Sequence, residues 1–117
     1  MNRRLTREQV EQIITSSREE GERPSLRRID LDGLDLRRAD LMGVDLMGAE
    51  LIGTGLTEAN LVESNLTAAD LRMANLSGAN LSGARLVGVD LRQARYNDTT
   101  LWPPNFDPTQ YGAIRDT

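Results

Sequence analysis

Leucine recurs at every fifth position over most of the chain, and this spacing dominates the hydrophobic pattern. The register begins at Leu26 and continues to Leu101, with Tyr96 as its one non-leucine member, which gives sixteen consecutive units of five residues. Two residues before each leucine the side chain is usually small, most often alanine, and the residue directly before the leucine is often Asp or Asn. Because the register is unbroken, we expect no inserted loop in this segment.

A period of five fits neither a helix nor a strand. On an α-helix a step of five residues rotates by about 140° net, so the leucines would spiral around the axis. In a strand five is an odd number, so successive leucines would point to opposite faces. A chain that keeps every leucine inside must therefore turn a corner once per unit. Four corners close a square coil, and stacked coils pair their backbones about 4.8 Å apart, so the sixteen units predict a column about 19 Å tall.

This reasoning predicts an all-β chain, a four-sided β-helix of about four coils of twenty residues over residues 24–103. Its structural core is the set of inward leucines, which comprises Leu31, Leu36, Leu41, Leu46, Leu51, Leu56, Leu61, Leu66, Leu71, Leu76, Leu81, Leu86 and Leu91.

The glycines support the corners, since seven of the ten lie two residues after a leucine. This is the position of a type II turn that requires a positive φ, which glycine adopts most easily. At the corners that carry Arg38, Glu58, Glu63 or Gln93 instead, we expect type I or irregular turns.

Both ends of the column carry a candidate cover, which a stacked sheet needs to avoid end-to-end association. Thr6 and Gln9 form a capping-box pattern, and Leu5 and Val10 are spaced as a hydrophobic staple. We predict a helix over 7–19 within an N-terminal capping segment of residues 1–23. Its apolar stripe, with Gly21 as the stop beyond it, consists of Val10, Ile13 and Ile14. The alternative is an amphipathic helix that binds a partner.

At the other end, residues 104–117 form a predicted C-terminal aromatic and proline loop cap. The aromatic side chains and Ile114 gather here, and the prolines stop further coils. We expect Trp102, Phe106 and Tyr111 to plug the column over Leu86, Leu91 and Leu101. The alternative is a ligand pocket or a stacking platform.

The composition bounds the chemistry. The 117 residues suffice for one domain, and the chain has no Cys and no His, which removes thiolate metal sites, the usual catalytic triads and the commonest general base. We expect no catalytic, cofactor-binding or metal-binding residue and no cofactor. The start of a calcium loop at Asp30–Gly33 lacks its closing Glu, because Leu41 occupies that position. The absence of a signal-peptide pattern or an apolar run long enough for a membrane span predicts a cytoplasmic protein.

The run ADLMG, AELIG and AADLRMANLSGANLSGARL resembles the pentapeptide-repeat family, whose consensus reads A(D/N)LXX. The resemblance covers residues 24–103 and implies a right-handed quadrilateral β-helix. The tail YNDTTLWPPNFDPTQYGAI looks like the C-terminal segments of cyanobacterial members of this family.

The outward positions form vertical ladders of residues twenty apart. One ladder holds four acids, Asp30, Glu50, Asp70 and Asp90, which neighbouring arginines compensate in its upper half. A second holds Met42 and Val62 with Trp102 at its top, and Met47 lies on the next side. We take the candidate interaction surface to be Met42, Met47, Val62, Asp30, Glu50 and Asp70. The alternative is an ordinary solvated surface of mixed charge.

The leading functional hypothesis is a non-enzymatic scaffold for an unknown protein partner, with no small-molecule substrate, no direct contact to nucleic acid or membrane, and a monomer favoured over a dimer. The alternative comes from the family resemblance, because some members mimic duplex DNA and bind DNA gyrase. The net charge of −4 and the short column weigh against this alternative, since duplex DNA carries one charge per about 1.7 Å. A small enzyme is disfavoured.

Overall fold

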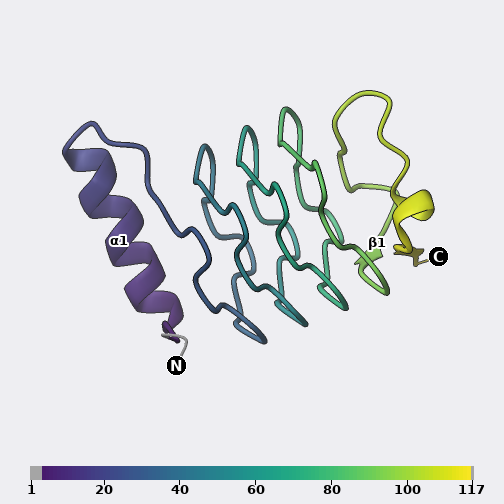
Figure 1. Ribbon diagram of the computed structural model, residues 1–117, viewed down its shortest axis with the longest axis horizontal. Coiled ribbons are helices and arrows are strands. Elements are labelled where there is room, and N and C mark those ends of the chain that lie inside the picture. The colour runs from purple at the N-terminus through teal and green to yellow at the C-terminus, as the bar shows by residue number, and fades with distance from the viewer. Residues whose placement is uncertain (1–3, 117) are drawn as a thin grey trace.

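The molecule is a column of stacked coils with a helix across one end and a folded C-terminal segment across the other (Figure 1). This computed structural model describes residues 4–116, so residues 1–3 and 117 of the predicted end segments lie outside the described residues. Its elements are α1 (Arg7–Glu19), β1 (Arg95–Tyr96), the 3-10 helix η1 (Pro108–Tyr111) and β2 (Ile114–Arg115). The Cα atoms extend over 39 × 29 × 23 Å.

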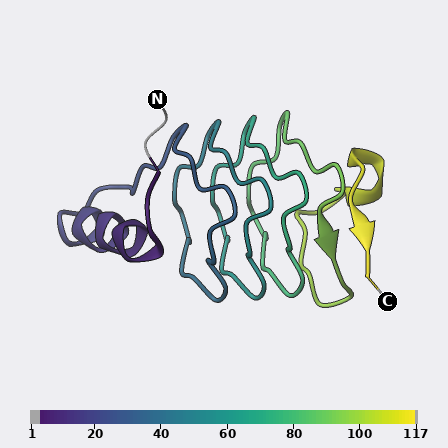
Figure 2. The ribbon, with the colours of Figure 1, turned by 90° about the horizontal axis from the view of Figure 1, so that it is seen from below.

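Parallel backbone bridges connect residues twenty apart along each of the four sides of the column. One side, for example, pairs Asp30 with Glu50, Glu50 with Asp70, and Asp70 with Asp90, so four levels are stacked. The predicted coil of twenty residues with four corners is therefore confirmed, and Figure 2 shows the coils lying one behind another between α1 and β2. Pairing is confined to single bridges on most sides because three of every five residues form a corner, and only β1 and β2 pair as named strands.

All corners from residue 28 to residue 93 use one backbone geometry. The carbonyl of each leucine accepts the N–H three residues later, as from Ala39 to Leu36 at 3.1 Å. The second residue of the corner has a positive φ throughout. The prediction of type I or irregular turns at the four non-glycine corners is wrong, because Arg38, Glu58, Glu63 and Gln93 have φ values of 58°, 60°, 59° and 62°. The ladder on either side imposes the corner, at a cost of about 1–2 kcal/mol for each L residue.

This corner geometry predicts a difference between two glycines of the same coil. Gly53 has a φ of +65°, and a Cβ added there would meet no atom within 4 Å. Gly53→Ala therefore changes only the strain of the backbone and should lower the free energy of unfolding by about 1 kcal/mol. Gly55 lies outside the positive-φ region and its Cβ would meet atoms only at 3.9 Å, so Gly55→Ala should be neutral or stabilising. Urea unfolding of both variants measures the difference, and equal effects would contradict the corner assignment.

The interior is filled by leucine and small side chains. Every leucine of the predicted core is buried, and the most accessible, Leu86, is only 8% exposed. Thr54 replaces alanine at one inward position, and its hydroxyl donates to the Leu31 carbonyl at 2.8 Å. At an equivalent inward position further along the chain, the Ser64 hydroxyl is buried without a partner among the described residues. The column therefore has a dry aliphatic core, with at least one polar atom left unsatisfied.

The register slips by one residue after Tyr96. Asn80 pairs with Leu101, a separation of 21 residues, whereas the lower levels of that side pair residues 20 apart. Leu101 consequently takes an outward position and is 52% exposed, while Trp102 packs against the core. The predictions that Leu101 completes sixteen units, that it lies under the aromatic plug and that Trp102 tops the Met42 ladder are wrong.

Side chains of the shifted segment compensate for the slip. Gly78 N–H donates to Asn97 Oδ1 at 3.1 Å and to Thr100 Oγ1 at 3.2 Å, where the lower coils use a backbone carbonyl. The Thr100 hydroxyl donates in turn to the Leu76 carbonyl at 2.9 Å. These bonds accommodate the extra residue without leaving the coil below unpaired at Gly78.

Helix α1 has the bounds that its sequence pattern predicts. The Thr6–Gln9 capping box is present, and Val10 and Ile14 are buried against the column. At the C-terminus, Glu22 N–H donates to the Ser17 carbonyl at 2.8 Å while Gly21 adopts a φ of 72°. This is a Schellman arrangement, which stops the helix and turns the chain into the first coil.

Arginines of the N-terminal segment cover the open carbonyl edge of the first coil. Arg7 donates to the carbonyls of Asp35 and Arg37 at 3.2 and 2.8 Å, and Arg18 donates to Met42 at 2.9 Å. Higher in the column the equivalent carbonyls accept from the coil below, as Glu50 does from Leu31 at 2.7 Å. The arginine side chains thus replace a missing coil, which closes this edge to a second chain.

Candidate interaction surface

The residue before each leucine has a structural role that its charge conceals. In most units its side-chain Oδ1 accepts the backbone N–H two residues later, as in an Asx turn, at 3.0–3.2 Å. This bond is made by Asp30, Asp35, Asp40, Asp45, Asn60, Asn65, Asp70, Asn75, Asn80 and Asp90. Asp and Asn are interchangeable here because both present Oδ1. The acidic residues at this position therefore stabilise the corner through their Oδ1 atoms, and only their negative charge remains available for binding a partner.

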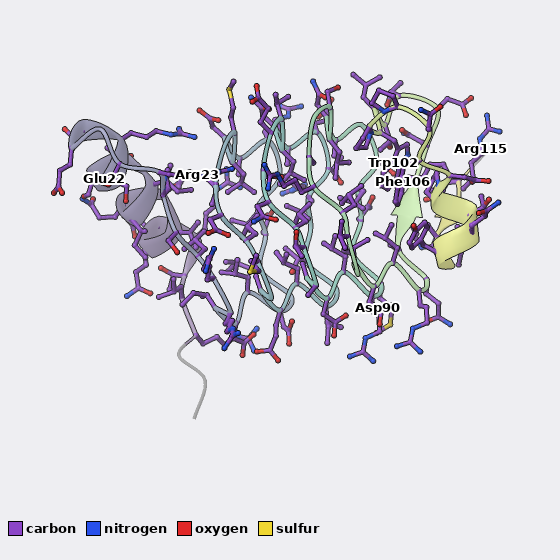
Figure 3. The ribbon with its side chains drawn as sticks, turned by 45° about the horizontal axis from the view of Figure 1, so that its top comes forward. Glu22, Arg23, Asp90, Trp102, Phe106 and Arg115 are labelled. Carbon is purple, nitrogen blue, oxygen red and sulfur yellow. The ribbon has the colours of Figure 1, made fainter. Side chains whose placement is uncertain are left out.

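The ladder of four acids is in line, as predicted, and arginines compensate its upper half. Arg72 contacts Asp70 at 2.7 Å and approaches Asp90 to 3.7 Å, and Arg92 contacts Asp90 at 2.7 Å. Asp90 is labelled on this side of the column in Figure 3. The alternation of charges offsets the repulsion between stacked carboxylates, although each exposed pair contributes little stability by itself.

The arginines lower the pKa of the carboxyls that they contact. A side-chain hydrogen bond from Arg72 is the main cause for Asp70, and one from Arg92 is the main cause for Asp90. Folding lowers the pKa of such a carboxyl, so the carboxyl stabilises the folded protein at any pH above its pKa in the unfolded chain, which is near 3.8. This stabilisation is lost as the pH falls through the lower pKa that the carboxyl has in the folded chain.

We therefore expect the melting temperature to fall as the pH drops below about 4. The double variant Asp70→Asn/Asp90→Asn keeps the Oδ1 acceptor of each corner but removes both titrating groups. Its melting temperature should depend less on pH over the same range, which thermal unfolding followed by circular dichroism measures. An unchanged pH dependence would show that these ion pairs contribute nothing to stability.

The predicted apolar anchors occupy two adjoining sides. Met42 is 47% exposed, and Met47 and Val62 are half-buried. Gly43 N–H donates to the Val62 carbonyl at 2.9 Å, so Met42 and Val62 lie on adjacent levels of one side, while Met47 follows the next corner. Arg18 and Asp40 form an ion pair of 3.0 Å beside Met42. Met42 and Val62 thus form a small apolar surface with a charged border, whereas Asp30, Glu50 and Asp70 lie on a different side.

Several exposed apolar side chains near the C-terminal end were not predicted as surface anchors. Val87 is 75% exposed, Met73 55%, Ile114 46% and Tyr111 43%. Val87 follows a leucine directly, at the outward position that Met42 and Val62 also hold, so the register itself identifies it as exposed. Ile114 and Tyr111 carry no such signal, because their exposure depends on how the tail folds over the column.

The aromatic side chains form one continuous stack. Trp102 meets Tyr96 edge-on at 5.6 Å between ring centroids and stacks on Phe106 at 5.3 Å, and Phe106 stacks on Tyr111 at 4.7 Å. Figure 3 shows Trp102 and Phe106 together at the column end. Trp102 and Phe106 pack against the core, so an aromatic plug is present, but Tyr111 is 43% exposed at its rim and Leu86 borders a hollow beside it.

The described residues offer little for catalysis. A hollow next to α1 is lined by charged groups that already pair with one another, such as Arg37 with Asp35 and Arg38 with Glu58, both at 3.0 Å. Within residues 4–116 no three acidic side chains gather into a potential metal site. Over the same residues, no helix has the length and apolar character required to cross a membrane.

Comparison with known proteins links this geometry to a family. A sequence profile described as pentapeptide repeats, with 8 copies, matches residues 25–61 and 59–95. The crystal structure of a pentapeptide repeat protein from Nostoc Pcc 7120 matches with 31% identity and a TM-score of 0.63, covering 95% of this chain and 96% of its own. A pentapeptide repeat protein from the Arabidopsis thaliana thylakoid lumen matches with 29% identity and a TM-score of 0.61, covering 76% of this chain and 59% of its own.

A more distant structure shares the fold alone. The plasmid-mediated fluoroquinolone resistance protein QnrB1, in a trypsin-treated form, matches with 16% identity and a TM-score of 0.53, covering 79% of this chain and 50% of its own. Comparison with curated proteins gives no match. The match to the Nostoc structure extends over the column and both of its ends, so the fold described above recurs in a solved protein.

Proposed function

We propose that this chain, which belongs to the pentapeptide-repeat family, is a non-enzymatic scaffold that binds a protein partner through the outside of its column. The observation that carries the proposal is the division between inside and outside. Leucine and small side chains fill every level of the interior, which leaves no room there for a substrate. The residues that directly follow each leucine, such as Met42 and Val62, lie outside that interior and can vary without disturbing it. A right-handed coil, as the family resemblance implies, presents them as regular ladders.

The side that carries Met42 and Val62 is the apolar centre of the proposed surface. Its charged border consists of Asp40 with Arg18 and of Glu63, whose carbonyl accepts from Arg23 at 3.2 Å. An apolar centre within a polar border is the usual composition of a protein interface. Met47 extends this centre around one corner, and the ladder of Asp30, Glu50 and Asp70 supplies negative charge for steering on another side.

The proposal is tested by isolating a partner with the wild-type chain and then measuring its binding to two double variants. Met42→Ser/Val62→Ser should weaken binding at least about tenfold, because it removes the apolar centre. Asp30→Asn/Asp70→Asn should mainly flatten the salt dependence of binding, because it keeps the corner hydrogen bonds and removes two negative charges, one of them the partner of Arg72. Undiminished binding by both variants, with unchanged melting temperatures, would reject the sides of the column as the binding surface.

Binding of DNA gyrase by mimicry of duplex DNA is the alternative, and the resistance named for QnrB1 motivates it. The charge weighs against it. Duplex DNA as long as the 39 Å column and caps would carry about 23 charges at one per about 1.7 Å, whereas this chain has a net charge of −4. A gyrase supercoiling assay decides between the two, since a scaffold for another partner should leave supercoiling unchanged at any concentration of the chain.

A further inference from the structure

The C-terminal segment pairs with two sides of the column and leaves the side of Leu86 without a level above it. On the side of Leu91, the Gly112 carbonyl accepts from Gln93 N–H at 2.8 Å, and on the side of Tyr96, strand β2 pairs with β1. Between Trp102 and Gly112 the chain crosses the column end without forming a level above Leu86. We name the side that carries Leu26, Leu46, Leu66 and Leu86 the open side.

Backbone donors point out of the last level of the open side. One level lower, Leu66 N–H donates to the Arg85 carbonyl and Ala68 N–H to the Val87 carbonyl, both at 2.8 Å. The corresponding N–H groups of Leu86 and Gly88 have no acceptor within residues 4–116. The missing level would supply two carbonyls, from residues directly above Arg85 and Val87.

An apolar hollow lies where the side chains of that missing level would pack. Its floor is Ala84, Leu86 and Val87, and its opposite wall runs from Pro103 to Phe106 and includes Tyr111. Leu86 is 8% exposed although Leu46 and Leu66 below it are fully buried, and Val87 is 75% exposed. The end of the leucine ladder is therefore accessible through this hollow.

A cation borders the same edge. Arg85 is exposed and forms no ion pair with any residue from 4 to 116, whereas most arginines along the ladders contact an acid. Each position before a leucine lies directly under its equivalent in the next level, as Asn65 lies under Arg85. A carboxylate above Arg85 would therefore meet the guanidinium.

We propose that the open side binds an extended peptide segment of a partner protein, in which an acidic residue precedes an aliphatic one, as a parallel fifth level. Its two carbonyls accept from Leu86 and Gly88, its aliphatic side chain enters the hollow, and its carboxylate pairs with Arg85. This inference rests on the proposed scaffold role and locates one binding site at the column end.

The test is a titration of the ¹⁵N-labelled full chain with the peptide acetyl-Ala-Asp-Leu-Thr-Gly-Ala-amide, followed by NMR. The amides of Leu86 and Gly88 should shift most, and their hydrogen exchange should slow as they gain acceptors. Replacing the peptide's Asp by Lys should weaken binding about tenfold, and so should Arg85→Glu in the chain, since each change loses a charge-assisted contact. Arg28→Glu, the same charge change at the far end of the open side, should leave binding unchanged.

Three outcomes would overturn the proposal: no shift at the highest peptide concentration, shifts centred away from residues 84–88, or equal binding by Arg85→Glu. Shifts of the same amides that follow protein concentration instead of peptide would also overturn it, and would identify a second copy of the chain as the occupant. The titration measures peptide binding at the end of the column, whereas the Met42 and Val62 variants measure partner binding at its side. Failure of this inference and failure of the scaffold proposal are therefore distinguishable.

Discussion

Leu56→Asp is expected to leave the chain unfolded at room temperature. Leu56 is 1% exposed in the middle of the column, with leucines on the levels above and below. A carboxylate there has no cation or water to replace its hydration, and it would have to be buried protonated or disrupt three levels of the ladder. The marginal stability of a small domain, about 5–15 kcal/mol, does not tolerate that cost together with the lost leucine packing. Far-ultraviolet circular dichroism and gel filtration measure the result.

Two further variants make this prediction specific. Leu56→Ala should fold but lose about 2–5 kcal/mol of unfolding free energy, because it leaves a cavity in a close-packed core. Leu101→Asp is the matched control, since Leu101 belongs to the same sequence register but is 52% exposed, and it should change stability by no more than about 0.5 kcal/mol. A folded Leu56→Asp, or an unfolded Leu101→Asp, would contradict the assignment of inside and outside.

Removal of the N-terminal cap is the second change with a large expected effect. Deleting residues 1–20 should expose the first coil and convert the chain into oligomers that associate end to end. The deletion removes the apolar cover of Val10 and Ile14 and also the arginines that bind the carbonyls of the first coil. The exposed edge then offers unpaired acceptors next to apolar side chains, which is the usual basis of strand association. Sedimentation velocity over a range of concentrations measures it.

Substitutions in the full chain separate the two components of the cap. Val10→Asp/Ile14→Asp should detach the helix and reproduce the association, whereas Gln12→Asp on the exposed face of α1 should not. Arg7→Met/Arg18→Met removes the carbonyl contacts while keeping much of the side-chain volume, and it should produce a smaller effect of the same kind. If the truncated chain stayed monomeric with the stability of the wild type, α1 would have a function other than covering the column.

The candidate site was predictable only in part. The register identified the outward positions, and it placed Met42 and Val62 on one side because a period of twenty residues follows from four units of five. The hydrogen bonds of Asp30 and Asp70 were not predictable as such, since a carboxylate before a leucine looks like surface charge until the N–H two residues later is seen to donate to it. The open edge at Leu86 was not predictable either, because it depends on the path of residues 103–112.

The bounds of α1 and the inward leucines were determined by the sequence itself, because both depend on contacts between residues close in the chain. A capping box spans four residues, and a corner repeats every five, so each leaves a local pattern that is visible in the sequence. Repetition then made the fold unambiguous, since an unbroken period admits only one stacking that keeps every leucine inside.

Only the tertiary structure decided the features that connect distant residues. The single-residue slip that turns Leu101 out and Trp102 in is set by pairing with Asn80 and by the Asn97 and Thr100 bonds to the coil below. The uniform corners at Glu58 and Gln93 likewise arise because the neighbouring levels impose a positive φ, which is unfavourable for residues other than glycine. In each instance hydrogen bonds across about twenty residues outweigh a local preference of about 1–2 kcal/mol, and such bonds have no signature in the spacing of side chains along the chain.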